Sequence, residues 1–170
     1  ASVQEMADFV GLAFDLAFKY RNPAIILADG VIGQMMEKVV LPEQRPRLTN
    51  EEVMARCPWA TFGKLKHRGP NIVTSLELDP AEMEKRNIHL QQKYAEIEVR
   101  YEEIHCDDAE YLIVAFGSCA RIAQKAMEEA RAEGIKVGLL RPITLWPFPS
   151  KAIAERSRQV KGILTCLLYT

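Results

Sequence analysis

The residues with the clearest chemical potential lie where a predicted strand leads into a predicted helix. Gly117 and Ser118 follow the apolar run Tyr111–Phe116 and precede a segment rich in helix-forming residues. The amino end of a helix offers free backbone amides and the positive end of the helix dipole to an anion. Nucleotide-binding loops need several glycines, whereas this turn has one. We therefore expect Gly117–Ser118 to be either an anion-binding turn or an ordinary tight turn in which Ser118 caps the helix.

A second polar cluster contains side chains of the types that bind metal ions: His105, Cys106, Asp107 and Asp108. Four adjacent residues cannot converge on one ion without ligands from elsewhere in the chain. We therefore interpret the cluster as a polar loop between two elements.

Four cysteines are widely spaced and form no C-x-x-C pair: Cys57, Cys106, Cys119 and Cys166. A disulfide framework is not expected at this spacing, and zinc or iron–sulfur sites need paired ligands, so free thiols in a reducing cytoplasm are predicted. No histidine has a marked partner for nucleophilic catalysis. The residues alone predict no catalytic, cofactor-binding or metal-binding residue.

The stretch from Leu140 to Pro149 contains the most unusual composition of the chain, with three prolines and two large aromatic residues. It follows the carboxyl end of a predicted parallel strand, where open α/β sheets place their binding loops. Proline restricts the backbone, and large aromatic side chains favour contact with another protein. We expect Arg141, Trp146 and Phe148 to contact a neighbouring subunit.

The last third of the chain has the pattern strand, helix, strand, helix, strand. The predicted strands are Tyr111–Phe116, Ile135–Leu140 and Gly162–Cys166, and the predicted helices cover about residues 119–133 and 151–159. Gly134 is expected to end the first helix and Ser150 to cap the second. The residues of the first helix expected to face inward are Ala120, Ile122, Ala123, Ala126, Met127 and Ala130. This order predicts an α/β fold with parallel strands and right-handed crossovers.

The first part of the chain predicts a helix that begins with the capping box Ser2–Glu5 and ends before Asn22-Pro23. The apolar run Ala24–Ala28 suits a strand buried on both faces. This helix and strand cannot cover each other's apolar surfaces, so they are interpreted as the tail of a preceding α/β domain. Prolines interrupt residues 36–78, where a short helix from Thr49 and a strand at residues 72–76 are predicted within an extended connection. A helix with one apolar seam is then expected from Asp79 to about Glu103.

Composition excludes several classes of protein. The 170 residues are 48% hydrophobic and 26% charged, with a net charge of −1, so neither a nucleic-acid partner nor an anionic membrane is expected. No apolar run approaches the roughly 20 residues of a membrane-spanning helix. The chain starts at Ala1 without a signal-peptide pattern and stops at Thr170 within an expected strand. We interpret both ends as cuts and expect a cytoplasmic protein.

Two stretches resemble a known family of enzymes. The segment "ASVQEM…DGVIGQMMEKV" resembles the end of the pyrimidine-binding domain in the α-type subunit of 2-oxoacid:ferredoxin oxidoreductases. The run Asp29–Glu37 is most similar to the branched-chain (2-oxoisovalerate) members. "LLRPITLWPFP" resembles the transketolase C-terminal-like domain of thiamine diphosphate enzymes, and "RPRLTNEE…HLQQKY" is similar to the family's interdomain segment. The resemblance covers about residues 1–162.

The resemblance implies an α/β fold with a three-layer parallel sheet (βαβαβ) at residues 79–170, also known as pyruvate-flavodoxin oxidoreductase domain II. The end of the pyrimidine-binding domain would occupy residues 1–40, and a linker would occupy residues 41–78. We also expect Gln34, Met35 and Met36, which lie in a predicted exposed loop rich in large side chains, to be near a domain or subunit boundary. The family would continue the chain after "VKGILT", whereas "CLLYT" stops short, so the last domain is expected to be truncated.

The resemblance also implies an activity, namely oxidative decarboxylation of a branched-chain 2-oxoacid to acyl-CoA with reduction of ferredoxin. Thiamine diphosphate, Mg²⁺, iron–sulfur clusters and coenzyme A would belong to the intact complex, with β- and γ-type subunits and ferredoxin as partners. The carboxylate that activates thiamine lies in an earlier part of the pyrimidine-binding domain. This chain would therefore serve assembly and support, bind no cofactor alone and be inactive in isolation.

Two other interpretations remain open at this point. One is a subunit of another thiamine enzyme, such as the β subunit of a 2-oxoacid dehydrogenase or a transketolase-like protein. The other is a regulatory module that binds a nucleotide or metabolite at the Gly117–Ser118 turn.

Overall fold

The computed structural model describes residues 2–61, 69–74 and 76–166. Contacts within the chain divide it into two compact units. The first unit combines the chain up to Leu41 with the chain from Gln91 onward, and the second is Pro42–Leu90. The last four residues of the expected truncated strand, 167–170, lie outside the described residues.

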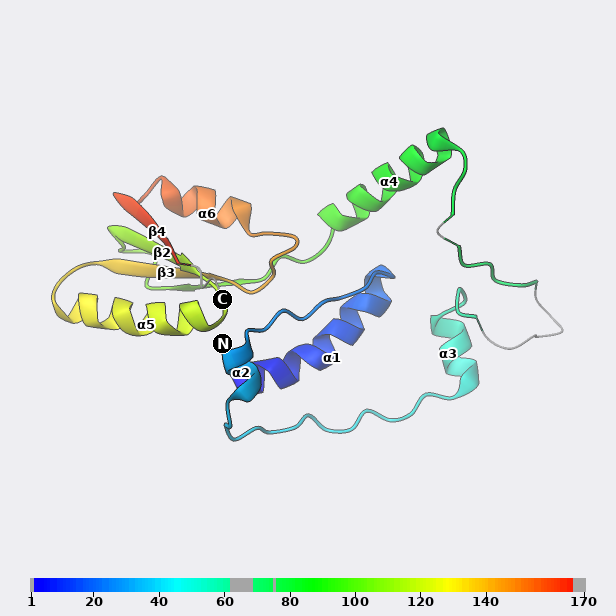
Figure 1. Ribbon diagram of the computed structural model, residues 1–170, viewed down its shortest axis with the longest axis horizontal. Helices are drawn as coiled ribbons and strands as arrows, with labels where there is room; N and C mark the ends of the chain where they lie inside the picture. The colour runs from blue at the N-terminus through cyan, green and yellow to red at the C-terminus, as the bar shows by residue number, and fades with distance from the viewer. Residues whose placement is uncertain (1, 62–68, 75, 167–170) are drawn as a thin grey trace. The chain divides into compact units, whose positions relative to one another are not determined.

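A four-stranded sheet forms the centre of the first unit (Figure 1). Its strands are β1 (Tyr101–Ile104), β2 (Tyr111–Ala115), β3 (Val137–Pro142) and β4 (Gly162–Cys166), in the order β1-β3-β2-β4. β2 pairs in parallel with both β3 and β4, which confirms the three predicted parallel strands. β1 pairs antiparallel with β3, so the sheet is mixed.

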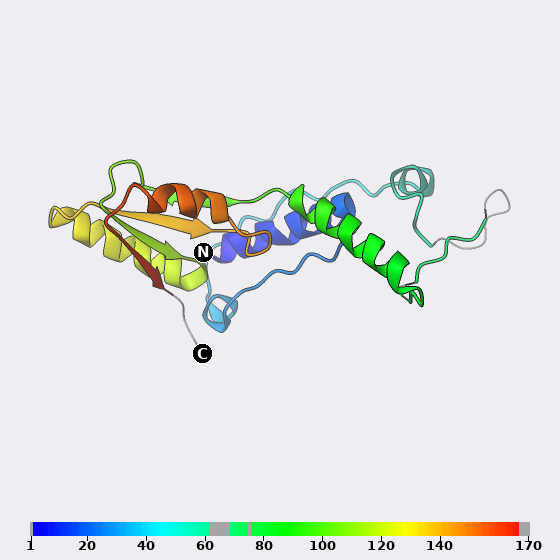
Figure 2. The same cartoon turned by 90° about the horizontal axis from the view of Figure 1, so that it is seen from above.

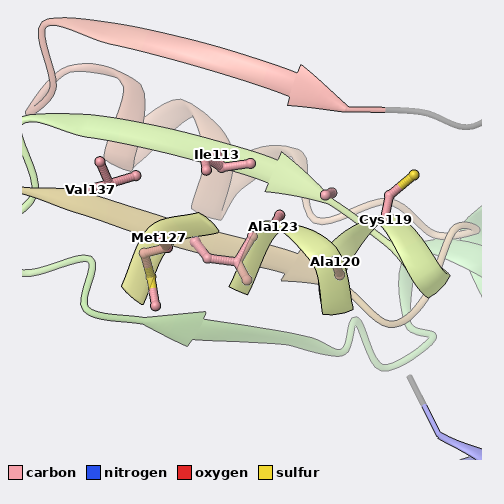
Figure 3. Packing of buried hydrophobic residues seen from close by; sticks show 8 residues of the cluster. Ile113, Cys119, Ala120, Ala123, Met127 and Val137 are labelled. Atoms are coloured by element: carbon pink, nitrogen blue, oxygen red, sulfur yellow. The ribbon is translucent and has the colours of Figure 1, made fainter. Parts of the chain in front are cut away.

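Alternate residues of β2 face two different helices, because successive side chains of a strand point to opposite sides of the sheet. Ile113 and Ala115 lie in one buried cluster with side chains of α5 (Gly117–Ala132). Figure 3 shows Ile113 in this cluster, together with Ala123 and Met127 of α5. Leu112 and Val114 lie in a second cluster with Ala152 of α6 (Ser150–Ser157). The two views in Figures 1 and 2 show α5 and α6 on opposite sides of the sheet. The predicted three-layer arrangement is therefore present.

The inward face of α5 is narrower than predicted. Ala120, Ala123 and Met127 are buried, as expected from their helical spacing, and Ala130 packs against the same cluster. The expectation was wrong for Ile122 and Ala126, which are both exposed, with Ile122 at 64%. Small residues occur on both sides of this helix, so composition did not identify which stripe faces the sheet.

The predicted serine caps were wrong for both helices. α5 begins at Gly117, two residues earlier than predicted, and its N-cap residue Phe116 makes no side-chain cap. α6 begins at Ser150 itself, and its N-cap residue Pro149 has no side chain that could accept from an amide. Gly117 has a φ of 59°, a conformation that costs little only for glycine, and this allows the helix to start there. Gly134, with a φ of 88°, follows the end of α5 as predicted.

The predicted long helix ends eight residues early and is followed by an unexpected strand. α4 spans Pro80–Ala95, and the Asp79 carboxylate accepts from the Ala81 amide at 2.9 Å, as expected for a helix start. β1 then occupies Tyr101–Ile104, which had been assigned to the helix. The apolar residues spaced by three and four suit a helix, but Tyr101 and Ile104 also favour a strand. Backbone pairing with the edge of β3 decides the outcome, and local spacing does not reveal it.

The first helix was predicted correctly and the strand after it was not. α1 spans Val3–Tyr20, and the Ser2 hydroxyl accepts from the Glu5 amide at 3.1 Å. Residues 24–28 form no strand, and Ile25 and Leu27 are 82% and 74% exposed. A strand that is apolar on both faces needs a neighbouring strand on at least one edge and cover on both faces. The described residues supply neither for this segment.

The second unit contains the predicted short helix. α3 spans Asn50–Arg56, and Thr49 and Glu52 form the complete capping box, in which each side chain bonds to the other's backbone amide. Apart from α3 and the start of α4, its described residues form no regular element. None of the described helices combines the length and apolar character that a membrane crossing would require.

Gly138→Ala should destabilise the first unit, because β3 passes close to the turn between β1 and β2. A Cβ at Gly138 would lie 2.9 Å from both the Ala109 Cβ and the His105 carbonyl oxygen. Crowding of this kind in a packed site costs about 1–3 kcal/mol of folding free energy. Urea unfolding of the purified protein measures this loss of folding free energy.

Gly162→Ala is the matched control, because the nearest atom to its new Cβ would be a Tyr111 ring carbon at an ordinary 3.5 Å. This control should keep the stability of the wild-type protein. Equal stability of the Gly138 and Gly162 variants would contradict the close approach of β3 to the turn.

Candidate functional site

The segment of residues 2–40 is attached to the α/β part of the first unit by polar contacts that we call the clasp. Its three carboxylates are Glu5, Asp29 and Glu37, and their partners are Arg141, Ser118 and Arg121 respectively. Each pair joins residues at least 84 positions apart in the sequence. The clasp brings two of the expected site residues, Ser118 and Arg141, together with carboxylates that the sequence analysis had not assigned to a site.

Asp29 occupies the amino ends of two helices at once. Its Oδ1 accepts from the Ile32 amide at 2.9 Å and thereby caps α2 (Gly30–Gln34). Its Oδ2 accepts from the Ser118 amide at 3.4 Å and from the Ser118 hydroxyl. The Ser118 amide belongs to the first turn of α5, whose positive dipole end favours a carboxylate. A negative group of the chain itself therefore lies at the Gly117–Ser118 turn.

The anion-binding role of Gly117 and Ser118 stays a prediction. An incoming anion would have to displace the Asp29 carboxylate, which already accepts from both donors of Ser118. Two negative groups close together at one helix end repel each other, so Asp29 opposes such a ligand.

Arg141 lies at the centre of a second pair of contacts. Its guanidinium bonds to Glu5 and, at 2.8 Å, to Glu102, and its side chain is only 14% exposed. Burial raises the pKa of Glu5, but the hydrogen bond and the positive charge of Arg141 outweigh it and hold that pKa below its usual value. These bonds tie α1 to β3. Contact of Arg141 with another subunit stays a prediction.

Glu37 forms the third attachment. One of its oxygens accepts from Arg121 of α5 at 2.8 Å, and the other accepts from the Val3 amide at 3.0 Å. The hydrogen bond from Arg121, followed by that from Val3, lowers the pKa of Glu37. Next to it, the Gln4 side chain exchanges two hydrogen bonds with the backbone of Val40, at 2.7 and 2.9 Å. The start of α1 is thus held at several points.

The other expected contact residues lie at the surface. Gln34 ends α2, Met35 follows as its C-cap and Met36 is 97% exposed. Trp146 is 78% exposed in the loop after β3, and Phe148 is 43% exposed. Exposed aromatic side chains of this size are typical of sites that bind another protein. Contact of these residues with another subunit stays a prediction.

The polar cluster after β1 forms a turn, as predicted. Asp107 pairs with Arg156 at 2.9 Å and Asp108 with Arg131 at 2.7 Å, so both carboxylates bind arginines. Cys106 is buried, and this burial is the main cause that raises the pKa of its thiol. In residues 2–61, 69–74 and 76–166, no three His, Cys, Asp or Glu side chains lie close enough together to hold a metal ion.

The α/β chain belongs to the pyruvate flavodoxin/ferredoxin oxidoreductase family. Residues 1–111 match the family's thiamine diphosphate-binding domain, and residues 109–167 match core domain II of pyruvate:ferredoxin oxidoreductase. This confirms the family inferred from the sequence.

Particular relatives narrow the comparison. The chain is 51% identical over 158 residues to the ketoisovalerate oxidoreductase subunit VorB of Methanothermobacter thermautotrophicus. The aligned region covers 91% of this chain and 43% of that protein. It is 32% identical over 176 residues to the 2-oxoglutarate synthase subunit KorA of Methanocaldococcus jannaschii, covering 91% and 48% respectively. The chain therefore spans less than half the length of these curated relatives.

A solved 2-oxoglutarate:ferredoxin oxidoreductase from Magnetococcus marinus is similar over 62% of this chain and 19% of its own, with 20% identity and a TM-score of 0.46. That similarity is too low for a comparison of sites.

The described residues do not fit a complete thiamine diphosphate site. A hollow of about 260 Å³ is lined only by apolar side chains, which offer no donors to a diphosphate: Val10, Ala13, Phe14, Ala17, Ala24 and Ile26. A second, of about 450 Å³, is an open depression on the outer face of α5 around Ile122. No polar or charged residue is buried in the described part of the chain. We derive no catalytic step from these residues.

Glu5→Gln should weaken the attachment of α1 in a pH-dependent way. Because the folded-state pKa of Glu5 is lowered, its stabilising effect is present above the unfolded value of about 4.3 and is lost as the pH falls through the folded value. We expect the variant to be about 1 kcal/mol less stable near pH 7, the upper end for a solvent-screened pair. This difference should disappear in acid.

Unfolding measured between pH 7 and pH 3 tests this expectation. Glu128→Gln is the matched control, because Glu128 lies on the exposed surface of α5 and its change should have little effect at any pH. A Glu5 variant whose loss of stability is the same at pH 7 and pH 3 would contradict the ionic contribution.

Proposed function

We propose that the chain is part of the α-type subunit of a thiamine diphosphate-dependent 2-oxoacid:ferredoxin oxidoreductase. The complex would convert a 2-oxoacid to acyl-CoA and CO₂ and reduce ferredoxin. The observation that carries the proposal is the succession of a thiamine-binding domain match and a core domain II match over nearly the whole chain. Thiamine diphosphate, Mg²⁺, iron–sulfur clusters and coenzyme A would be held by the intact complex.

The substrate we propose is a branched-chain 2-oxoacid such as 2-oxoisovalerate. The support is the difference in identity between two kinds of relatives, 51% to a ketoisovalerate oxidoreductase subunit and 32% to a 2-oxoglutarate synthase subunit, over 91% of the chain in both cases. Specificity among 2-oxoacids depends on how the pocket receives the side chain of the substrate. Subunits of similar sequence are therefore expected to build similar pockets.

The role we propose for residues 1–170 is assembly and support. Residues 1–40 would end the pyrimidine-binding domain, residues 41–78 would link the domains and residues 79–170 would form most of the transketolase C-terminal-like domain. In this arrangement the apolar segment of residues 24–28 would pair with strands outside these 170 residues. That pairing would explain why Ile25 and Leu27 are exposed here.

The partners we propose are the β- and γ-type subunits and, through the complex, ferredoxin in the cytoplasm. The surfaces offered to the subunits are the loop with Trp146 and Phe148 and the end of α2, where Gln34 and Met36 are exposed and Met35 is half-buried. Exposed aromatic and methionine side chains are enriched where proteins bind each other.

The complex, purified with all its subunits, tests the proposed activity. With coenzyme A and thiamine diphosphate present, 2-oxoisovalerate should reduce ferredoxin with a kcat/KM at least tenfold above that of 2-oxoglutarate. A tenfold preference corresponds to about 1.4 kcal/mol of differential transition-state binding. A preference for 2-oxoglutarate would contradict the substrate, and no reduction with any 2-oxoacid would contradict the function.

Trp146→Ala should impair assembly, because truncation removes the largest exposed side chain of the loop after β3. Hot-spot aromatic residues typically contribute about 2 kcal/mol or more to an interface. Size-exclusion chromatography of co-expressed subunits should show free subunits for this variant. Ile122→Ala, which truncates an exposed apolar residue on α5, is the control and should assemble normally. Full assembly of the Trp146 variant would contradict the proposed contact of this loop with another subunit.

A further inference from the structure

Asp29 is the clasp residue whose two oxygens accept from backbone amides of two different helices. Oδ1 accepts from the Ile32 amide of α2, and Oδ2 accepts from the amide and hydroxyl of Ser118 in α5. Hydrogen bonds with an ionised acceptor are about twice as strong as neutral ones. The carboxylate therefore holds the turn at residues 29–34 to the amino end of α5.

The burial of Ile32 and the backbone conformation of Gly117 support a close contact between the turn at residues 29–34 and α5. Ile32, which follows Asp29 by three positions, is 6% exposed and is the single buried residue among the described residues 2–41. Gly117 has a φ of 59°, so the start of α5 adopts a backbone conformation suited to glycine directly beside the carboxylate. A Cβ at this position would lie 3.7 Å from Asp29 Oδ2.

The position of this turn gives the contact a functional meaning. Residues 29–34 come directly after the segment of residues 24–28, whose apolar pattern is that of a parallel strand. Open α/β sheets bind ligands outside the carboxyl ends of their strands. Gly117 likewise follows the carboxyl end of β2. In the arrangement proposed above, in which residues 24–28 pair as a strand, Asp29 would join two loops of the kind that surround ligand sites.

We propose that Asp29 is a positioning residue that keeps the turn at residues 29–34 in its substrate-competent arrangement by bonding it to Ser118. The kinetic part of this proposal rests on the proposed 2-oxoacid oxidoreductase function. If the turn is released, only a fraction of the molecules holds the competent arrangement, and the apparent affinity for substrate falls by that fraction. Substrate at saturation selects the competent molecules, so the maximal rate is retained.

Asp29→Asn separates the two contacts. The remaining carbonyl oxygen can still accept from the Ile32 amide and cap α2, whereas the new NH₂ group cannot accept from the Ser118 amide. Ser118→Ala removes the hydroxyl from the other side, and Ser118→Thr restores it. Glu128→Gln removes a carboxylate from the exposed surface of α5 and is the matched control.

The experiment uses the intact complex and two readouts. Hydrogen exchange followed by mass spectrometry should show faster exchange, by about tenfold, at residues 30–36 and 117–120 in Asp29→Asn and Ser118→Ala. Steady-state kinetics should show a KM for 2-oxoisovalerate raised about tenfold and a kcat within twofold of the wild type. Ser118→Thr and Glu128→Gln should match the wild type in both readouts.

The outcomes separate this proposal from the proposed function. Unchanged exchange in both Asp29→Asn and Ser118→Ala overturns the contact, and a lower kcat with an unchanged KM overturns the positioning role. If the complex with Asp29→Asn fails to assemble, the exchange rates and KM of Ser118→Ala and Ser118→Thr test the proposal in its place. A wild-type complex that oxidises no 2-oxoacid contradicts the proposed function, while the exchange measurements still test the bond between Asp29 and Ser118.

Discussion

A parallel strand that is apolar on both faces must be covered on both faces and paired at its edges, and this constraint governs the whole chain. β2 meets it, because β3 and β4 pair with its two edges while α5 and α6 cover its two faces. Leu112 and Ala115 are each only 1% exposed as a result. The segment of residues 24–28 has the same apolar character, but no strand of the described residues pairs with it, and Ile25 and Leu27 are exposed. One part of the described chain thus contains a complete core, and another exposes apolar side chains on a segment without a paired strand.

Local chemistry accounts for the elements that were predicted correctly. The serine cap at Ser2, the capping box at Thr49, the carboxylate of Asp79 and the left-handed glycine Gly134 act within a few residues, so the sequence reveals them directly. The three parallel strands follow from short apolar runs separated by a helix pattern. β1 was not predicted, because its backbone hydrogen bonds join it to β3. The first residue of β3 lies 36 positions after the first residue of β1. Spacing alone cannot show such a partner.

The candidate site depended even more on distant contacts. Ser118 was expected to cap its own helix, yet its hydroxyl bonds to a carboxylate 89 positions earlier. Arg141 was singled out for its loop, whereas its partner Glu5 had been assigned only a capping role. The Asp29-Gly30 pair indicates a turn, and this was the one local sign in the sequence that Asp29 lies where it could contact another element. A carboxylate directly after an apolar run can accept hydrogen bonds from the amino end of a helix that is distant in the sequence, as Asp29 does from Ser118.

Family membership and geometry together support the proposal that residues 1–170 are a supporting part of a larger enzyme. The matched domains place thiamine chemistry in the family, while the described residues contribute a sheet, two covering helices and the clasp. The clasp connects the segment matched to the thiamine-binding domain with the segment matched to core domain II. Its three pairs lie at or near the surface, where single ion pairs contribute little, so their combined geometry matters more than any one of them.

A structure of the intact complex, determined by electron cryomicroscopy, tests this account most directly. The quantity to measure is the separation between the Asp29 carboxylate and the Ser118 amide and hydroxyl. The account predicts hydrogen-bond distances at both, with residues 24–28 paired on both edges in a parallel sheet. An Asp29 side chain turned away from α5, or residues 24–28 left unpaired in the assembled enzyme, would contradict it.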